Sequence, residues 1–215
     1  MSKIKNQWVV ALVTVAISYS ASADDGTFSA RPYLGVDLGY TKVKDEAQSI
    51  ANSLVSAVGG AATVTQDTSA YAGRIFAGYK VTENIDFEIA YLRTNNIGVS
   101  FSGVASNGTA YVGSSNITIG GFDYSALVRP SISSGYNNLY IRFGGTNLET
   151  KTSATVNGYS VSQNTNGTGL QYGIGYDGDI SNGLKSRIAF THYDKISGVS
   201  GNYANVFSVG IIKDF

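Results

Sequence analysis

Apolar and polar residues alternate strictly along eight segments of the chain. Leu34, Val36 and Leu38, for example, alternate with Gly35 and Asp37. A period of two residues is typical of a β-strand whose two faces meet different environments. The sequence therefore predicts eight strands, at residues 33–41, 74–81, 85–92, 121–128, 139–144, 170–177, 184–192 and 207–215.

Short and long connections alternate between these strands. The short turns lie near Thr82, Ser133 and Asn182. The long connections span about 44–68, 94–116 and 149–168, with a shorter one at 197–202. This asymmetry is typical of outer-membrane barrels, which have short periplasmic turns and long external loops.

Alternation alone does not show which face of the strands meets lipid, because a soluble lipocalin-type barrel has the same periodicity. Composition distinguishes the two kinds of barrel. Charged residues make up 14% of the chain, against roughly 25% in soluble domains. A soluble barrel needs a charged outside, whereas the outside of a membrane barrel contacts acyl chains. The sequence therefore predicts an all-β fold, an eight-stranded antiparallel up-and-down transmembrane β-barrel. Eight strands leave a lumen just wide enough for side chains to fill.

The first residues have the features of a secretory signal peptide. Lys3 and Lys5 precede an apolar run at 8–17, and Ala21-Ser22-Ala23 offers a small-residue cleavage site. The run is too short for a membrane-spanning helix. We therefore expect a cleaved signal peptide at 1–23, export through the Sec pathway, and a barrel at 24–215 in the outer membrane of a Gram-negative bacterium.

Ionic residues occur on the predicted inner faces of the strands. By alternation, the inward ions include Arg74, Glu88, Arg142 and Arg187. Their candidate acidic partners are Asp37, Asp123 and Asp177. An unpaired charge is costly in a narrow, partly dry lumen, so we expect these groups to pair with one another. The interpretation is a structural ion network, with a gate as the alternative.

Four strand segments resemble the transmembrane domain of OmpA and its small eight-stranded relatives. Residues 138–145, Asn-Leu-Tyr-Ile-Arg-Phe-Gly-Gly, resemble the family's fifth strand. Residues 87–91, 186–190 and 209–215 resemble its third, seventh and closing strands. The last segment departs from the family pattern at Lys213, where an apolar or aromatic residue is usual.

The resemblance implies roles for particular residues. In OmpA-like barrels an interior Arg–Glu pair acts as a gate, and Glu88 and Arg187 fall on the matching positions. The family's other gate residues, a lysine and a glutamate, are not matched, because Ala126 or its neighbours and Gly175 stand there. The terminal aromatic, Phe215, matches the signal that the assembly machinery is thought to recognise.

His192 is the only histidine, and the chain contains no cysteine. A multi-histidine or thiolate metal site is therefore not expected, and no cofactor is predicted. A lipid A deacylase of this fold class would carry a serine two residues after the histidine, but Asp194 stands there. We therefore predict no catalytic site. His192 and Tyr193 are assigned to the aromatic girdle at the membrane interface, with Tyr33, Tyr40, Tyr79, Tyr91, Tyr172 and Tyr176.

The long connections are the predicted carriers of function, because a rigid scaffold commonly presents binding residues on its loops. In the first, Ile50, Leu54 and Val58 predict one short amphipathic helix ending at Gly59-Gly60. The second and third are rich in Ser, Thr, Asn and Gly. The favoured function is surface interaction (adhesion, colonisation or serum resistance), with a resemblance to accessory colonisation factors. A narrow ion pore and a lipid A-modifying enzyme are the alternatives.

The expected partners follow from this location. They are outer-membrane lipid and lipopolysaccharide, periplasmic chaperones, the barrel assembly machinery and a host surface receptor. Without Lys3 and Lys5, 13 of the 15 basic residues remain against 15 acidic residues, a net charge near −2, which argues against nucleic acid as a partner. The barrel is expected to be a monomer.

Overall fold

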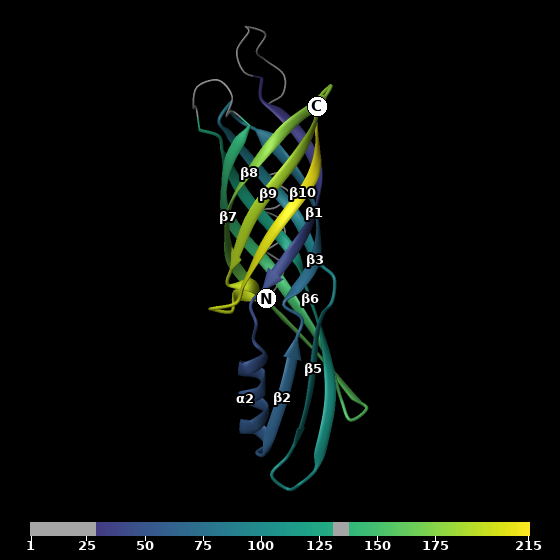
Figure 1. Ribbon diagram of the computed structural model, residues 1–215. Helices are drawn as coiled ribbons and strands as arrows, with labels where there is room; N and C mark the ends of the chain where they lie inside the picture. Colours follow the sequence, from purple (N-terminus) through teal and green to yellow (C-terminus); the bar gives the residue numbers. More distant parts are fainter. Residues whose placement is uncertain (1–28, 131–137) are drawn as a thin grey trace, which may run out of the picture.

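Eight antiparallel strands close into a ring in the computed structural model, which describes residues 29–130 and 138–215 (Figure 1). The ring is closed by pairing of the first strand with the last, for example Val36 with Ile211. The predicted antiparallel up-and-down order is confirmed. The ring strands are β1 (Arg31–Val43), β3 (Ser69–Lys80), β4 (Ile85–Thr94), β6 (Ala110–Val128), β7 (Leu139–Val156), β8 (Tyr159–Ser181), β9 (Leu184–Asp194) and β10 (Tyr203–Asp214).

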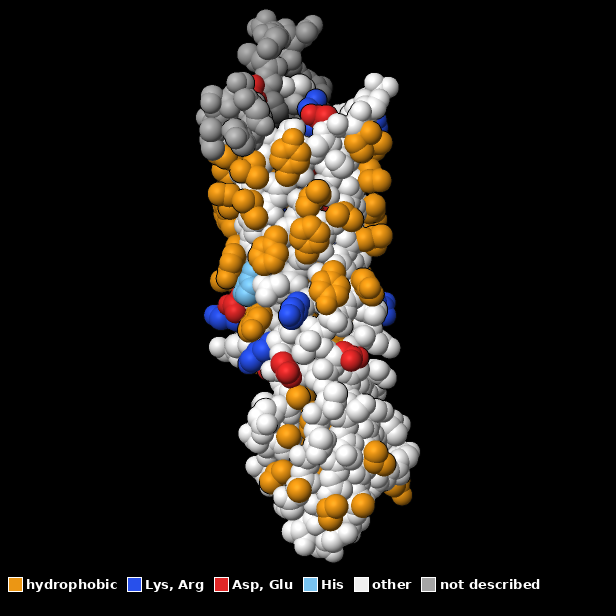
Figure 2. Space-filling model, in the orientation of Figure 1, with side chains coloured by type: hydrophobic (Ala, Val, Ile, Leu, Met, Phe, Trp, Pro, Cys, Tyr) orange, Lys and Arg blue, Asp and Glu red, His pale blue; other side chains and the backbone are white. Residues whose placement is uncertain are grey.

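The two faces of the wall have opposite character. Outward positions are exposed and apolar; Leu38, for example, is 73% exposed. Inward positions are buried and often charged, and Arg142 and Arg187 are each 1% exposed. Figure 2 shows the apolar side chains gathered across the visible face of the barrel, with charged residues at the lower edge of this apolar area. Such an inversion of the usual soluble pattern suits a surface in contact with lipid.

Three strands continue beyond the rim of the barrel and form an extension (Figure 1). The outer parts of β6, β7 and β8 are joined there by β2 (Ala61–Gln66) and β5 (Ile97–Val104), in the order β2-β5-β6-β7-β8. The helix α2 (Ala47–Val58) packs against β2. We call α2, β2, β5 and residues 110–117, 152–156 and 159–166 the extension.

The long connections differ in part from the sequence expectation. The helix expected from Ile50, Leu54 and Val58 is confirmed as α2, which ends at Gly59 with a left-handed φ of 70°. Segments 94–116 and 149–168 were expected to be polar loops, but they are mostly strand. Two-residue and slightly longer turns close these hairpins, and one 3-10 turn, η1 (Ile196–Gly198), occupies the fourth connection.

The turns at the opposite end are short, as expected. The side-chain oxygen of Thr82 accepts hydrogen bonds from the backbone N–H groups of Asn84 and Ile85. Asn182 and Gly183 both have left-handed φ values, 45° and 74°, as a tight hairpin turn requires. The expected signal peptide and most of the expected turn around Ser133 lie outside the described residues. Within the described ranges, no helix is long and apolar enough to cross a membrane.

Candidate functional site

Glu88 is the centre of a charged layer that crosses the lumen. It projects inward from β4 and receives hydrogen bonds from three arginines of three other strands. The donor–acceptor distances are 3.0 Å from Arg74, 2.8 Å from Arg142 and 2.5 Å from Arg187. The structure therefore brings together all four inward ions named from the sequence.

Further acidic groups complete the charge balance of this layer. Arg74 also donates to Asp37 at 3.2 Å and to Asp123 at 2.9 Å. Arg187 donates to Asp177 at 2.7 Å. Arg74 and Arg187 thus each have at least two carboxylate partners, which offset the lost hydration of a buried cation. Arg142 has Glu88 as its one carboxylate partner and also donates to the Thr191 hydroxyl at 3.3 Å.

Two members of the network were missed by the sequence analysis. Arg129 forms ion pairs with Asp86 and, at 2.7 Å, with Asp177. Arg129 lies one residue past the predicted end of its strand, so it was not assigned to a face. Asp86 shares the inward parity of Glu88, and the same alternation argument identifies it.

Aromatic rings hold the arginine layer in place. The Arg187 guanidinium lies 4.8 Å from the centroid of Phe76 and 4.9 Å from that of Tyr140, within cation–π range. Tyr140 in turn lies over Gly175, where an added Cβ would come within 2.3 Å of the ring. A glycine is therefore required at this position by the close approach of the ring.

Two tyrosines assigned to the membrane interface lie in the lumen instead. Tyr33 is 1% exposed, and its hydroxyl donates to Glu88 at 3.0 Å. Tyr193 is buried against Leu92 and Val206. Both share the parity of inward residues on their strands, so alternation predicts their placement better than proximity to a strand end.

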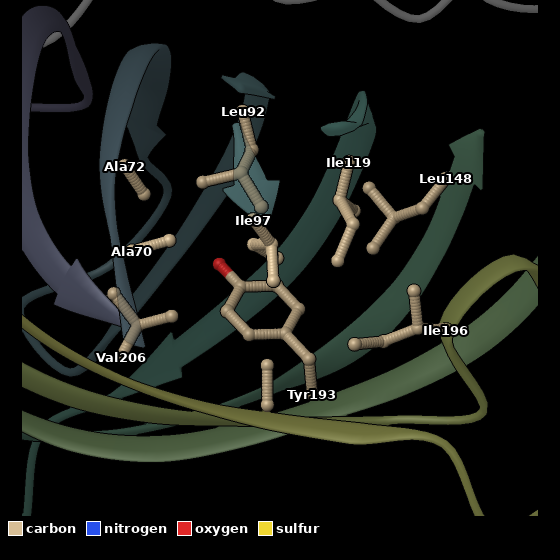
Figure 3. Close-up of a cluster of buried hydrophobic side chains, with 10 residues drawn as sticks. Ala70, Ala72, Leu92, Ile97, Ile119, Leu148, Tyr193, Ile196 and Val206 are labelled. Atoms are coloured by element: carbon tan, nitrogen blue, oxygen red, sulfur yellow. The ribbon is translucent and has the colours of Figure 1, made fainter. Parts of the chain in front are cut away.

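An apolar plug fills the lumen between the charged layer and the extension (Figure 3). Tyr193 lies at its centre, with Ile97 of β5 and Ile196 of η1 close by. Its buried members are Ala70, Ala72, Leu92, Ile97, Ile119, Leu148, Tyr193, Ile196, Ala204 and Val206. The plug joins the first residue of β5 to the barrel wall.

Little free volume remains among these side chains. Two cavities of about 10 Å³ each lie among the described residues, one beside Arg74 and Arg142 and one beside Tyr193 and Leu148. A cavity of this size has room for roughly one water molecule. At the other end of the lumen, Lys80 and Lys185 pair with Asp214 at 2.6 and 3.4 Å. Buried side chains of the plug, the charged layer and the Asp214 cluster thus occupy the lumen at successive depths.

His192 lies on the outside of the wall. Its ring lies between those of Tyr172 and Tyr203, with centroid distances of 4.8 and 5.6 Å. Its Nδ1 is 2.8 Å from the side-chain oxygen of Asn205. Among the described residues, no serine or carboxylate hydrogen bonds to this ring, so the geometry provides no nucleophile or orienting acid. Phe215 is exposed at the opposite end, and its backbone N–H donates to Pro32.

The extension differs from the barrel in chemistry. Residues 47–66, 95–122 and 152–176 contain no Asp, Glu, Lys, Arg or His. Rows of hydroxyl side chains cross the sheet; one consists of Thr65, Ser100, Ser114, Thr155 and Ser160 on adjacent strands. Figure 2 shows no charged side chain on this part of the visible face. The extension therefore presents an ordered, neutral, hydrogen-bonding surface.

Comparison with known families agrees with this architecture. The sequence matches the family described as "Outer membrane protein beta-barrel domain" over residues 9–213. The chain belongs to this family. Its place is therefore the outer membrane, and the short turns and the extension lie on opposite sides of that membrane.

Solved structures show the same fold at low sequence identity. Neisserial surface protein A is 17% identical and aligns over 87% of this chain and 100% of that one, with a TM-score of 0.50. Ail of Yersinia pestis, in complex with the heparin analogue sucrose octasulfate, is 9% identical and aligns over 86% and 99%, with a TM-score of 0.51. No curated protein sequence gives a significant match.

Proposed function

We propose that this outer-membrane protein is a surface-binding protein in which the barrel is the anchor and the extension is the contact surface. The observation that carries the proposal is the combination of a filled lumen with an ordered sheet that continues beyond the rim. A charged layer and an apolar plug occupy the lumen in series, so transport is poorly supported. The extension is the part of the described chain that projects furthest beyond the rim and is free to meet a partner.

The chemistry of the extension favours a neutral partner. Ail was crystallised with a polysulfated ligand, but no cation stands on the extension of this chain to bind such a polyanion. The exposed cations Lys42, Arg93 and Lys195 lie at the rim instead, where phosphates of lipopolysaccharide are their natural counter-ions. The proposed target of the extension is an uncharged surface on a host cell, on another bacterium or in the environment.

A trimmed barrel tests this function. Replacing 99–115 and 153–162 by two-residue Asn-Gly turns removes two hairpins at paired positions, because Gly98 pairs with Asn116 and Thr152 with Gln163. Ile97 and Ile117 stay in place, so the plug is retained. We expect the trimmed chain to fold, as shown by a heat-modifiable band on a gel, and to lose attachment to epithelial cells and hydrated surfaces.

Val199→Ser is the matched control, because Val199 is exposed at the same end of the barrel but outside the extension. This variant should attach like the parent. A folded trimmed chain that attaches as well as the parent would contradict the proposed function.

A further inference from the structure

The outer part of β8 is an uncovered sheet edge. Residues Tyr159–Asn166 pair with β7 on one side, whereas pairing with β9 on the other side begins only at Leu170. The 3-10 turn η1 reaches Gly167, which lies against the backbone of Ser197. At the opposite edge of the extension, α2 packs against β2 (Figure 1). The sheet is therefore covered at one edge and free at the other.

Every second residue of this edge has backbone N–H and C=O groups that point away from β7 and are free to pair with another strand. Asn157 and Gly158 form a two-residue turn with φ values of 47° and 85°, so Val156 and Tyr159 form a hydrogen-bonded pair. Every second residue then turns its N–H and C=O away from β7. Those residues are Ser160, Ser162, Asn164 and Asn166.

The edge has none of the features that usually prevent strand addition. Natural sheets protect their edges with charges, prolines, bulges or very short strands. Residues 159–166 contain no charge and no proline, and their register with β7 is continuous. Tyr159 and Val161 beside this edge are 83% and 65% exposed. An unprotected edge of eight residues is a template for another strand.

We propose that this edge pairs with the same edge of a second copy of the chain in a facing outer membrane. This inference rests on the proposed function of the extension as the contact surface and names its partner. An extension without Asp, Glu, Lys, Arg or His meets its own copy with no like-charge repulsion. Two identical strands pair antiparallel in a closed, two-fold contact, so no further edge is left to propagate.

The symmetry of this contact determines where the second barrel lies. The two-fold axis of an antiparallel pair is perpendicular to the sheet. Since the extension continues the barrel wall, that perpendicular is radial to the barrel and lies in the membrane plane. Rotation about it turns the second barrel upside down, into an opposing membrane. The contact therefore joins two cells, and each barrel stays a monomer in its own membrane.

The proposed register pairs all four outward residues. Ser160 lies opposite Asn166 of the second copy, and Ser162 lies opposite Asn164. In this register every outward N–H and C=O of the segment has a partner, which antiparallel pairing between hydrogen-bonded positions requires.

Disulfide trapping tests the contact, because the chain contains no cysteine of its own. One strain displays the full chain with Ser162→Cys and another displays it with Asn164→Cys. Mixing the two should give a cross-linked dimer that neither strain gives alone. Ser153→Cys, on the neighbouring strand and the same face, is the matched control and should not cross-link. Equal cross-linking by the control, or cross-links within one strain only, would overturn the proposal.

Edge variants test whether the contact holds cells together. Ser162→Pro removes one outward N–H and leaves the pairing with β7, so cell clustering should be lost while the heat-modifiable band stays. Ser162→Lys with Asn164→Lys should also abolish clustering, and mixing these cells with cells carrying aspartates at both positions should restore it. Edge variants that cluster like the parent would overturn this contact, whereas loss of attachment in the trimmed chain would still support the proposed function.

Discussion

Glu88 on β4 and Arg187 on β9 meet across the lumen, with Oε1 and Nη1 2.5 Å apart. Arg74 and Arg142 donate to the other oxygen of the same carboxylate. One acidic side chain is thus the shared counter-ion of three buried cations, and the stability of the charged layer depends on it.

Glu88→Gln should destabilise the barrel strongly. The amide has no charge to offset the three arginines, and removing one partner of a buried ion pair typically costs about 3–5 kcal/mol. Urea titration of the protein folded in lipid vesicles should show the loss as a lower unfolding midpoint. Glu149→Gln is the control: Glu149 pairs with Lys151 at the rim at 3.6 Å, and a surface pair is worth about 0–1 kcal/mol. Equal midpoints for the two variants would contradict this account.

The folded protein should show no discrete ionic conductance in planar bilayers. An ion has to pass both the layer around Glu88 and the plug around Tyr193, which lie in series along the lumen. Leu148→Ala opens only the plug, so this variant should also show no discrete conductance. Stepwise currents from the folded parent would instead favour the pore.

Gly175→Ala should impair folding, and Gly73→Ala should not. An added Cβ at Gly175 would lie 2.3 Å from the Tyr140 ring, whereas nothing lies within 4 Å of a Cβ at Gly73. Forcing a methyl group into a packed interior costs typically about 1–3 kcal/mol. The comparison is the urea midpoint of each variant. If both variants matched the parent, the ring would not require the glycine.

Phe215→Ala should reduce assembly more than stability. Phe215 is exposed, so few packing contacts are lost, but the resemblance to OmpA-like barrels assigns the assembly signal to this ring. The folded fraction in the outer membrane should fall several-fold, while refolded material unfolds at the parental urea concentration. Phe207→Ala, an exposed aromatic on the same strand, is the control and should assemble normally.

Strand positions and inward ions follow from alternation, which is a local property of the sequence. Alternation cannot show which ions meet, because the partners of Glu88 are 14, 54 and 99 residues away along the chain. Tyr33 was misplaced because the preference of tyrosine for the membrane interface was weighed above the parity that it shares with Asp37.

The extension shows the same limit in another form. Val99 and Phe101 alternate with Ser100 and Ser102, so the pattern indicates β5 once the segment is considered as a strand. The next hairpin alternates too: Ala154, Val156, Tyr159 and Val161 share one face, and Ser153, Thr155, Ser160 and Ser162 share the other. Residues 163–168 contain only Gln, Asn, Thr and Gly and give little periodic signal, so their strand structure depends on pairing with β7, a contact that the local pattern does not contain.

The length of β8 has a mechanical consequence. Its 23 residues extend roughly 75 Å, from the Asn157-Gly158 turn in the extension to the opposite end of the barrel. A pull on this turn therefore loads the hydrogen bonds to β7 in shear, many at once, rather than peeling them apart one by one. Tension between an attached surface and the cell is therefore carried by the barrel wall itself, because the strand runs from the extension into the barrel without a flexible linker.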